Sequence, residues 1–134
     1  MDKPFEVKEL DTIICNEDYK DDEKYKNVKQ YMLISPTAVN ILGSNLPMAA
    51  PAQDQQEYID NYAQKLDSNI KFVDTYTTLL EHKKEDIFYR SDHHWTSLGA
   101  FYSYQKLADV MDLSKKDSDD YDIELVSNSF VGAL

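Results

Sequence analysis

The order of apolar runs and helical patterns predicts an α/β fold with three layers, in which helices flank a mostly parallel sheet. Two short apolar runs, Tyr31–Ser35 and Asn69–Asp74, are typical of buried strands of such a sheet. Parallel strands need a long connection, and a helix-containing segment separates these two runs. With only three Gly and four Pro in 134 residues, tight turns are too few for an all-β fold. We therefore expect the two runs to be neighbouring parallel strands.

The other elements of the first half follow from local composition. Val7–Cys15 is a candidate strand, and Asn16–Gln30 has the composition of a helix. Thr37–Pro51 contains three turn-forming residues and is predicted to be an irregular crossover. In the segment 52–66, apolar side chains recur at the spacing of one helix face, and these are Tyr58, Ile59, Tyr62, Ala63 and Leu66.

The second half continues the alternation. Thr75–Lys84 is predicted to be a short helix and Ile87–Arg90 a third strand. Ile123–Phe130 has the pattern of the beginning of a last strand. Thr96 is a good N-cap for a helix that continues to about Asp112. Its predicted inner face comprises Leu98, Phe101, Tyr102, Gln105, Leu107, Ala108 and Met111.

Charge and composition exclude several classes of function. The formal net charge is −11, which repels phosphate backbones and anionic lipid, so nucleic acid is not expected as a partner. The acidic stretches Asp18–Glu23 and Asp117–Asp122 are interpreted as solvated segments, because neither matches a calcium-binding loop. No apolar run approaches ~20 residues and no signal peptide is recognised, so no transmembrane segment is expected. Cys15 is the only cysteine, which excludes an internal disulfide and indicates a small core residue.

The tetrapeptide Asp92-His93-His94-Trp95 holds two of the three histidines and the only tryptophan. It follows the predicted strand Ile87–Arg90, and in α/β sheets ligands bind beyond the carboxyl ends of strands. In an extended loop, Asp92 and His94 point to the same side. The carboxylate can then accept the Nδ1 proton of His94 and leave Nε2 as a general base.

Spacing leaves alternatives open. The structural alternative, which spacing alone favours, has Asp92 capping the helix and His94 packed under Trp95. A metal site is disfavoured, because adjacent histidines are expected to point apart and no third ligand is evident. No GxSxG motif supplies a nucleophile. Four serines are interpreted as turn or cap residues, and these are Ser35, Ser44, Ser127 and Ser129.

The run YRSDHHWTSLGAFYSY resembles the DHHW family of bacterial proteins, which in turn resemble the SGNH-hydrolase-like domains of alginate O-acetyltransferase-type proteins. The upstream segments YMLISPTAVNIL and IKFVDTYTTLLEHKKEDIFYR agree with this resemblance. The similarity extends in detail from Tyr31 to Leu134, and it implies an SGNH/flavodoxin-like sheet.

The resemblance also implies roles. Asp92 would be the orienting acid and His94 the base of a Ser-His-Asp triad. The pocket would be formed by Trp95 as its wall, by His93 in the variable position of the motif, and by Arg90. The family's nucleophilic Ser lies in a downstream Asp-Ser segment that has no match here. The resemblance therefore predicts one incomplete domain over residues 1–134, without a cofactor.

The expected function is that of a partial domain related to esterases and O-acyltransferases of cell-envelope glycans. The isolated chain would be inactive, and the protein would be located outside the cytoplasm of a bacterium. The alternative is a non-catalytic carbohydrate- or protein-binding module, favoured by the absent Ser and the ten Tyr. A metalloenzyme is a third reading. Missing strands would leave an apolar edge, which a second copy of the chain is expected to cover.

Overall fold

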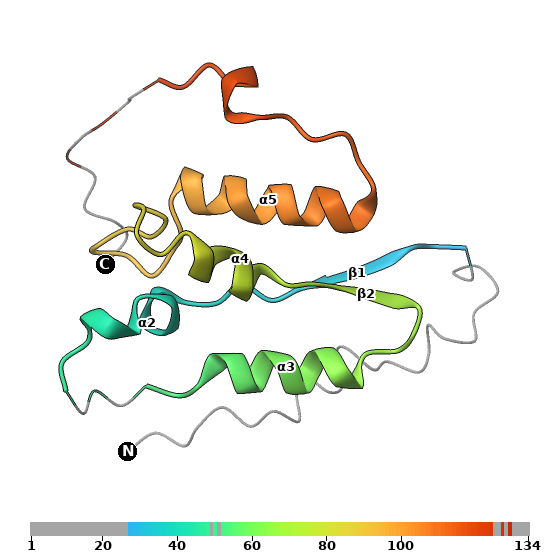
Figure 1. Cartoon of the computed structure of the whole chain (residues 1–134), viewed down its shortest axis with the longest axis horizontal. Coiled ribbons are helices and arrows are strands. Elements are labelled where there is room, and N and C mark those ends of the chain that lie inside the picture. The colour runs from blue at the N-terminus through green and yellow to red at the C-terminus, as the bar shows by residue number, and fades with distance from the viewer. Residues whose placement is uncertain (1–26, 49, 51, 125–126, 128, 130–134) are drawn as a thin grey trace.

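The two predicted neighbouring strands form a parallel pair. The computed structural model describes residues 27–48, 50, 52–124, 127 and 129. Strand β1 (Gln30–Leu33) pairs with β2 (Ile70–Val73) in the register Gln30↔Ile70 to Leu33↔Val73. Figure 1 shows helix α3 (Gln55–Lys65) on one side of the pair and helix α5 (Ser97–Met111) on the other, whereas helix α4 (Thr75–Glu81) follows β2 at the end of the sheet. The α/β class with flanking helices is confirmed.

A buried threonine joins the ends of the two strands. Thr75 is the first residue of α4, two positions after the end of β2, and is fully buried. Its hydroxyl donates a hydrogen bond of 2.9 Å to the carbonyl oxygen of Ile34, just beyond β1. Asp74 caps α4 by accepting a hydrogen bond from the backbone N–H of Thr77. Helix and sheet are therefore fixed together where the strands end.

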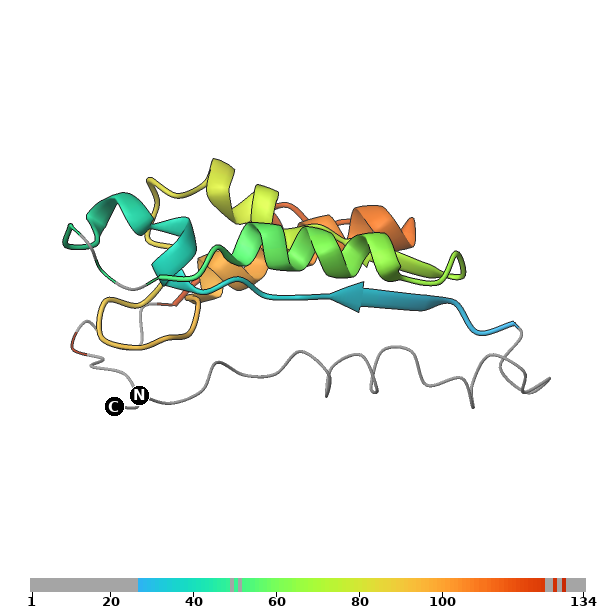
Figure 2. The same ribbon diagram turned by 90° about the horizontal axis from the view of Figure 1, so that it is seen from below.

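The predicted crossover Thr37–Pro51 contains more regular structure than its turn residues suggested. A short helix α2 (Ala38–Ile41) is followed by the 3-10 helix η3 (Gly43–Asn45). Gln55, in the first turn of α3, accepts a hydrogen bond from the N–H of Thr37 and donates its own N–H to Asn40. These bonds attach the crossover to α3. Figure 2 shows α2 at the end of the sheet toward which β1 points.

The prediction of a third strand at Ile87–Arg90 is wrong. Phe88 forms only an isolated antiparallel bridge with Trp95, so the chain turns back on itself between them. Ile87 and Phe88 are nonetheless buried in the core, at 0% and 6% exposure. The apolar run that suggested a strand is therefore explained by the burial of these two side chains in the core, not by pairing in the sheet. The histidines lie in this loop, which we call the 88–95 loop, and not beyond a third sheet strand.

The last predicted helix is confirmed, and its predicted inner face is confirmed in part, because Leu98 and Tyr102 pack against the core and Ala108 is buried. α5 begins at the Thr96 cap and ends at Asp112, whose φ of 57° is left-handed. Its most buried residues are Gly99, Ser103 and Ala108, of which only Ala108 was in the predicted face. Small side chains permit a close approach, and hydrophobicity alone does not reveal it. A 3-10 helix, η4 (Ser118–Asp120), follows.

The core gathers side chains from several elements. It contains Ile41, Ile59, Tyr76, Leu79, Ile87 and Phe88. The predicted strand Val7–Cys15 and most of the predicted helix Asn16–Gln30 lie outside the described residues, and residues 27–29 are not helical. Ile123 and Glu124 are not in a strand, and most of the remaining predicted strand is also outside the described part. No helix among the described residues is long and apolar enough to cross a membrane.

Candidate functional site

Backbone hydrogen bonds close the 88–95 loop at its base. The N–H of Thr96 donates to the carbonyl of Ile87 at 2.9 Å, and the N–H of Tyr89 donates to the carbonyl of His94 at 3.2 Å. The hydroxyl of Thr96 donates to the carbonyl of Asp86 at 2.7 Å and also accepts the N–H of Gly99. Thr96 thus fixes both the loop and the first turn of α5.

Gly99 lets α5 lie directly against the base of this loop. A Cβ atom at position 99 would lie 2.4 Å from the carbonyl oxygen of Ile87 and 3.0 Å from the Cβ of Trp95. Real Cβ atoms do not approach backbone this closely, so any other residue requires the loop or the helix to shift. Gly99 therefore sets the distance between α5 and the residues that carry the histidines.

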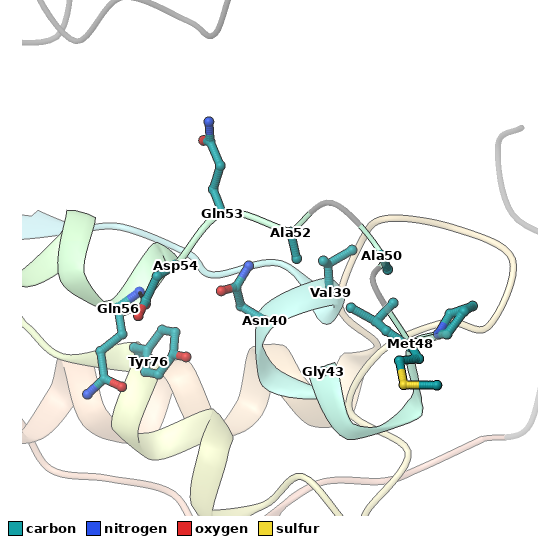
Figure 3. Close-up of a pocket in the computed structure, with 12 residues that line it drawn as sticks. Val39, Asn40, Gly43, Met48, Ala50, Ala52, Gln53, Asp54, Gln56 and Tyr76 are labelled. Atoms are coloured by element: carbon teal, nitrogen blue, oxygen red, sulfur yellow. Dashed lines mark hydrogen bonds between the residues drawn. The ribbon is translucent and has the colours of Figure 1, made fainter.

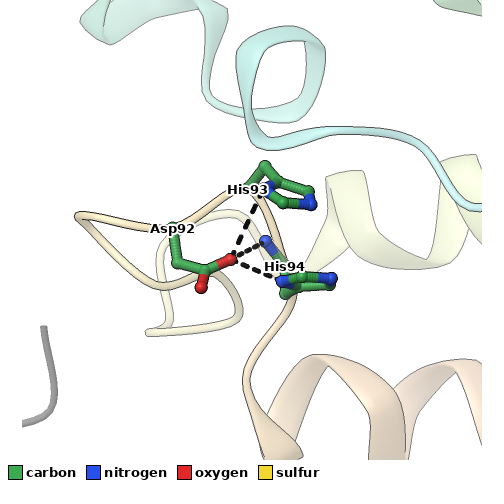
Figure 4. Close-up of side chains that lie close together, drawn as sticks. All are labelled: Asp92, His93 and His94. Atoms are coloured by element: carbon green, nitrogen blue, oxygen red, sulfur yellow. Dashed lines mark hydrogen bonds and ion pairs between the residues drawn. The ribbon is translucent and has the colours of Figure 1, made fainter. Parts of the chain in front are cut away.

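Asp92 and His94 form a hydrogen-bonded pair (Figure 4). One carboxylate oxygen of Asp92, Oδ1, lies 2.5 Å from Nδ1 of His94 and accepts the backbone N–H of His94 at 2.8 Å. Because an ionised carboxylate only accepts hydrogen bonds, this contact suits the tautomer in which Nδ1 carries the proton and Nε2 is the basic nitrogen. The Asp92 side chain is 4% exposed, whereas that of His94 is 62% exposed. A buried acid thus holds an accessible imidazole.

The structural alternative predicted contacts that differ from the observed ones. The cap of α5 is Thr96, not Asp92. His94 is exposed, whereas a ring packed under Trp95 would be buried. Trp95 itself is half-buried and packs against the core. The side chain of Arg90 is 93% exposed, and its guanidinium nitrogen Nη2 lies 3.9 Å from the carboxylate oxygen Oδ1 of Asp86.

The two adjacent histidines share one side of the loop, contrary to the expectation that they point apart. Their ring centroids lie 4.0 Å apart, with the ring planes inclined by 37°. Nδ1 of His93 lies 3.7 Å from the same Asp92 oxygen that binds His94. The expectation assumed an extended strand, in which successive side chains alternate. Because the 88–95 loop is bent, that alternation does not apply.

The four serines interpreted above as turn or cap residues are not paired with His94 in the described part of the chain. Ser35 donates its hydroxyl hydrogen bond to the carbonyl of Pro36 at 3.3 Å. The hydroxyls of Ser127 and Ser129 lie 3.4 Å from each other. Neither these three nor Ser44 forms a hydrogen bond with His94 among the described residues. The functional groups that the structure pairs in this loop are therefore the acid Asp92 and the base His94.

Sequence reasoning missed a second histidine–carboxylate contact. Nδ1 of His82 lies 2.7 Å from Glu85, and the hydroxyl of Tyr102 donates to the other Glu85 oxygen at 2.6 Å. The rings of His82 and Tyr102 are stacked, with centroids 3.5 Å apart. The hydrogen bonds from Tyr102 and His82 lower the pKa of Glu85, and Glu85 raises the pKa of Tyr102. The i, i+3 spacing of His82 and Glu85 was the available signal, but Tyr102 comes from α5.

A cavity that is wide open to solvent, and that sequence reasoning also missed, lies between α2, η3 and the beginning of α3 (Figure 3). Its volume is about 560 Å³, and polar lining groups include Asn40, Asp54 and Gln56. Tyr76 lines it from α4. Burial raises the pKa of Tyr76, and Asp54 and Asp60 raise it further. The cavity thus combines an aromatic ring with hydrogen-bonding side chains.

Comparisons with known proteins agree with the fold and the motif. The structure is similar to a DHHW family protein from Eubacterium siraeum, with 29% identity, a TM-score of 0.65, and coverage of 72% of this chain and 31% of that one. It is also similar to Bacillus cereus PatB1, with 25% identity, a TM-score of 0.60, and coverage of 77% and 34%. A structure of PatB1 with a sulfonyl adduct matches with a TM-score of 0.61.

The chain spans about a third of the length of these solved structures. No curated protein sequence matches it. The family model described as "SGNH hydrolase-like domain, acetyltransferase AlgX" matches residues 17–129. With the layered fold and the Asp92–His94 pair in the motif loop, this match over most of its length shows that the chain belongs to the family of AlgX-type SGNH hydrolase-like domains.

Proposed function

We propose that this chain supplies the general base and the orienting acid of an acyl-transfer site. The reaction class is that of esterases and O-acyltransferases. The substrate is a cell-envelope glycan outside the cytoplasm, which accepts an acyl group on a hydroxyl or donates one from an O-acyl ester. The observation that carries the proposal is the hydrogen bond of 2.5 Å between buried Asp92 and exposed His94. Membership of the AlgX-type family supports it.

The geometry suits each proton transfer of this chemistry. A serine hydroxyl would give its proton to Nε2 of His94 as its oxygen attacks the acyl carbonyl. His94 would return that proton to the leaving alcohol, which leaves an acyl-serine. An accepting hydroxyl would then attack the acyl group and lose its proton to Nε2, and His94 would return that proton to the serine oxygen as the acyl–serine bond breaks. In each step the Asp92 carboxylate stabilises the imidazolium and holds Nδ1–H in place.

The serine of this proposal is none of Ser35, Ser44, Ser127 and Ser129. A sulfonyl adduct forms when a nucleophilic side chain attacks a sulfonyl reagent, so the PatB1 structure with such an adduct supports a nucleophile in the relatives. Because the chain aligns with about a third of those structures, we infer that another segment supplies the nucleophile.

The first test uses the 134-residue chain and p-nitrophenyl acetate at neutral pH. We expect no hydrolysis above that of a His94→Ala variant, because a base and its orienting acid need a nucleophile beside them. His82→Gln serves as the matched histidine control. Turnover that disappears with both His94→Ala and one serine substitution would place the nucleophile inside this chain and overturn that part of the proposal.

The second test uses the longest reading frame that contains these residues. Its deacetylation of an O-acetylated glycan should fall on the order of 10²–10⁴-fold in His94→Ala and should be retained in His82→Gln. A sulfonyl fluoride should label one serine in wild type, and labelling should slow in His94→Ala because the base no longer activates that serine. Equal activity of wild type and His94→Ala would refute a general-base role.

Glycan binding without chemistry is the second candidate function, and the cavity of about 560 Å³ favours it. Tyrosine rings and side-chain amides are suited to sugar recognition. Titration of the chain with acetylated oligosaccharides should then perturb the amide resonances of Asn40 and Gln56 and leave those of the 88–95 loop unchanged. Perturbation of the loop alone would argue against this candidate.

A further inference from the structure

We propose that Asp92, His93 and His94 form a binding site for a divalent transition-metal ion, with Zn²⁺ as the best-suited ion. One carboxylate oxygen and one nitrogen from each ring lie within 4.8 Å of one another. The three residues come from one loop whose base is closed by backbone hydrogen bonds, so their relative positions are held before an ion arrives. Figure 4 shows both rings on the side of the Asp92 carboxylate.

The distances between the side chains are near those of a tetrahedral zinc site. Zinc bonds of about 2.0–2.1 Å at tetrahedral angles place neighbouring ligand atoms ~3.3 Å apart. The Asp92–His93 separation is 3.7 Å, so this pair needs little movement. Oδ1 of Asp92 and Nδ1 of His94 are 2.5 Å apart and must separate by somewhat under 1 Å. The ion takes the place of the proton on Nδ1, which moves to Nε2 of the same ring through solvent. The exposed His94 ring can make that adjustment by rotating within its loop.

The identity of the donors selects the class of ion. Two imidazole nitrogens and one carboxylate oxygen suit Zn²⁺ and Cu²⁺, whereas Ca²⁺ and Mg²⁺ prefer sites made only of oxygen. Exposure also fits an ion that binds from solution, because the His93 and His94 side chains are 75% and 62% exposed. The buried Asp92 carboxylate supplies the negative charge. With three protein ligands, water would complete the coordination shell.

Metal binding and acyl transfer would compete for the same atoms. An ion that binds Asp92 and His94 disrupts the hydrogen bond through which the acid orients the base. This consequence rests on the proposed function, but the binding itself does not. The test below measures binding alone, so its failure and the failure of the proposed function remain distinguishable.

Isothermal titration of the 134-residue chain with Zn²⁺ near pH 7.5 tests the site directly. We expect one site in wild type, and a dissociation constant at least about tenfold weaker in His93→Ala and in Asp92→Asn, each of which removes a ligand. His82→Gln and Asp119→Asn are the matched controls, because each removes a histidine or an acid elsewhere and should leave the dissociation constant unchanged. Circular dichroism verifies that every variant is folded.

Trp95, the only tryptophan in the chain, gives a second readout beside the site. Cu²⁺ should quench its fluorescence in wild type, and quenching should require at least about tenfold more Cu²⁺ in His93→Ala. Equal weakening in ligand and control variants, or equal binding in all of them, would assign the ion to the acidic surface and overturn the proposal. So would the absence of Zn²⁺ binding and Cu²⁺ quenching in wild type.

Discussion

Single residues decide how the histidine loop is held. Gly99 is the clearest case, because the space that its missing side chain leaves is filled by the carbonyl of Ile87. Ile87 is fully buried, so the carbonyl cannot easily move away. The position of Asp92 and His94 relative to α5 therefore depends on a residue that takes no part in their chemistry.

Gly99→Ala should destabilise the fold although alanine is the better helix former. The added Cβ would lie 2.4 Å from the Ile87 oxygen, so the loop or the helix must shift. We expect a loss of about 1–3 kcal/mol of unfolding free energy, typical of overpacking. The urea midpoint, followed by Trp95 fluorescence, measures it. The exposed position Ser97, where Ser97→Ala should be nearly neutral, is the control. A midpoint for Gly99→Ala at or above wild type would contradict the close approach.

At the scale of elements, two contacts attach α5 to the segment that precedes the loop. Thr96 caps the helix and also donates its hydroxyl to the Asp86 carbonyl. Farther along α5, Tyr102 reaches back to Glu85, which also contacts His82 at the end of α4. The helix thus holds both ends of the segment 82–96 against the core.

Thr96→Ala should lose both hydrogen bonds of its hydroxyl. The cap contributes ~1 kcal/mol and a second hydrogen bond a similar amount, so we expect a loss of about 1–2 kcal/mol in unfolding free energy. Thr96→Ser keeps the oxygen and should retain most of the stability. Urea unfolding of the three proteins provides the comparison. Equal losses for the alanine and serine variants would show that the methyl group, not the hydroxyl, is responsible.

The Glu85 contact predicts a pH dependence. Because hydrogen bonds from Tyr102 and His82 depress the pKa of Glu85 below its usual 4.5, its stabilisation is present above pH 4.5 and is lost as the pH falls below that value. The difference in urea midpoint between wild type and Glu85→Gln should therefore shrink as the pH is lowered from 6 into this acidic range. Glu81→Gln, at an exposed helix position, is the control. A difference that stays constant with pH would exclude the mechanism.

At the scale of the whole molecule, the sheet is small and several apolar side chains are exposed. In the described part of the chain β1 pairs only with β2, so its second edge has no strand partner there. Leu33 at the end of β1 is 37% exposed, and Val28 just before the strand is 54% exposed. Edges of this kind favour pairing with another strand.

We therefore expect the 134-residue chain to self-associate through β1 as its concentration rises. Leu33→Lys places a charge at the strand end and should shift the equilibrium toward monomer, since lysine on an edge opposes pairing. Met48→Lys, which changes an equally apolar residue in the crossover that is 99% exposed, should have no effect. Sedimentation velocity over a range of concentrations provides the measurement. A monomer at all concentrations would refute the prediction.

What the sequence by itself determined are the features governed by spacing along the chain. The parallel pair of β1 and β2, the three main helices and the Thr96 cap follow from apolar period, chain length between strands, and capping chemistry. The sequence offered the Asp92–His94 contact as one of two alternatives, and spacing alone favoured the other, so the bend of the loop decided which side chains meet.

Only the tertiary structure decided the features that join distant segments. Ile87–Arg90 shows the signal of a buried strand, yet burial against the core, without a strand partner, satisfies it. The bend that brings His93 beside His94 depends on pairing across the loop, and the Glu85–Tyr102 contact spans 17 residues. Local propensity cannot anticipate such contacts, because their free energy comes from packing that exists only once the elements have assembled.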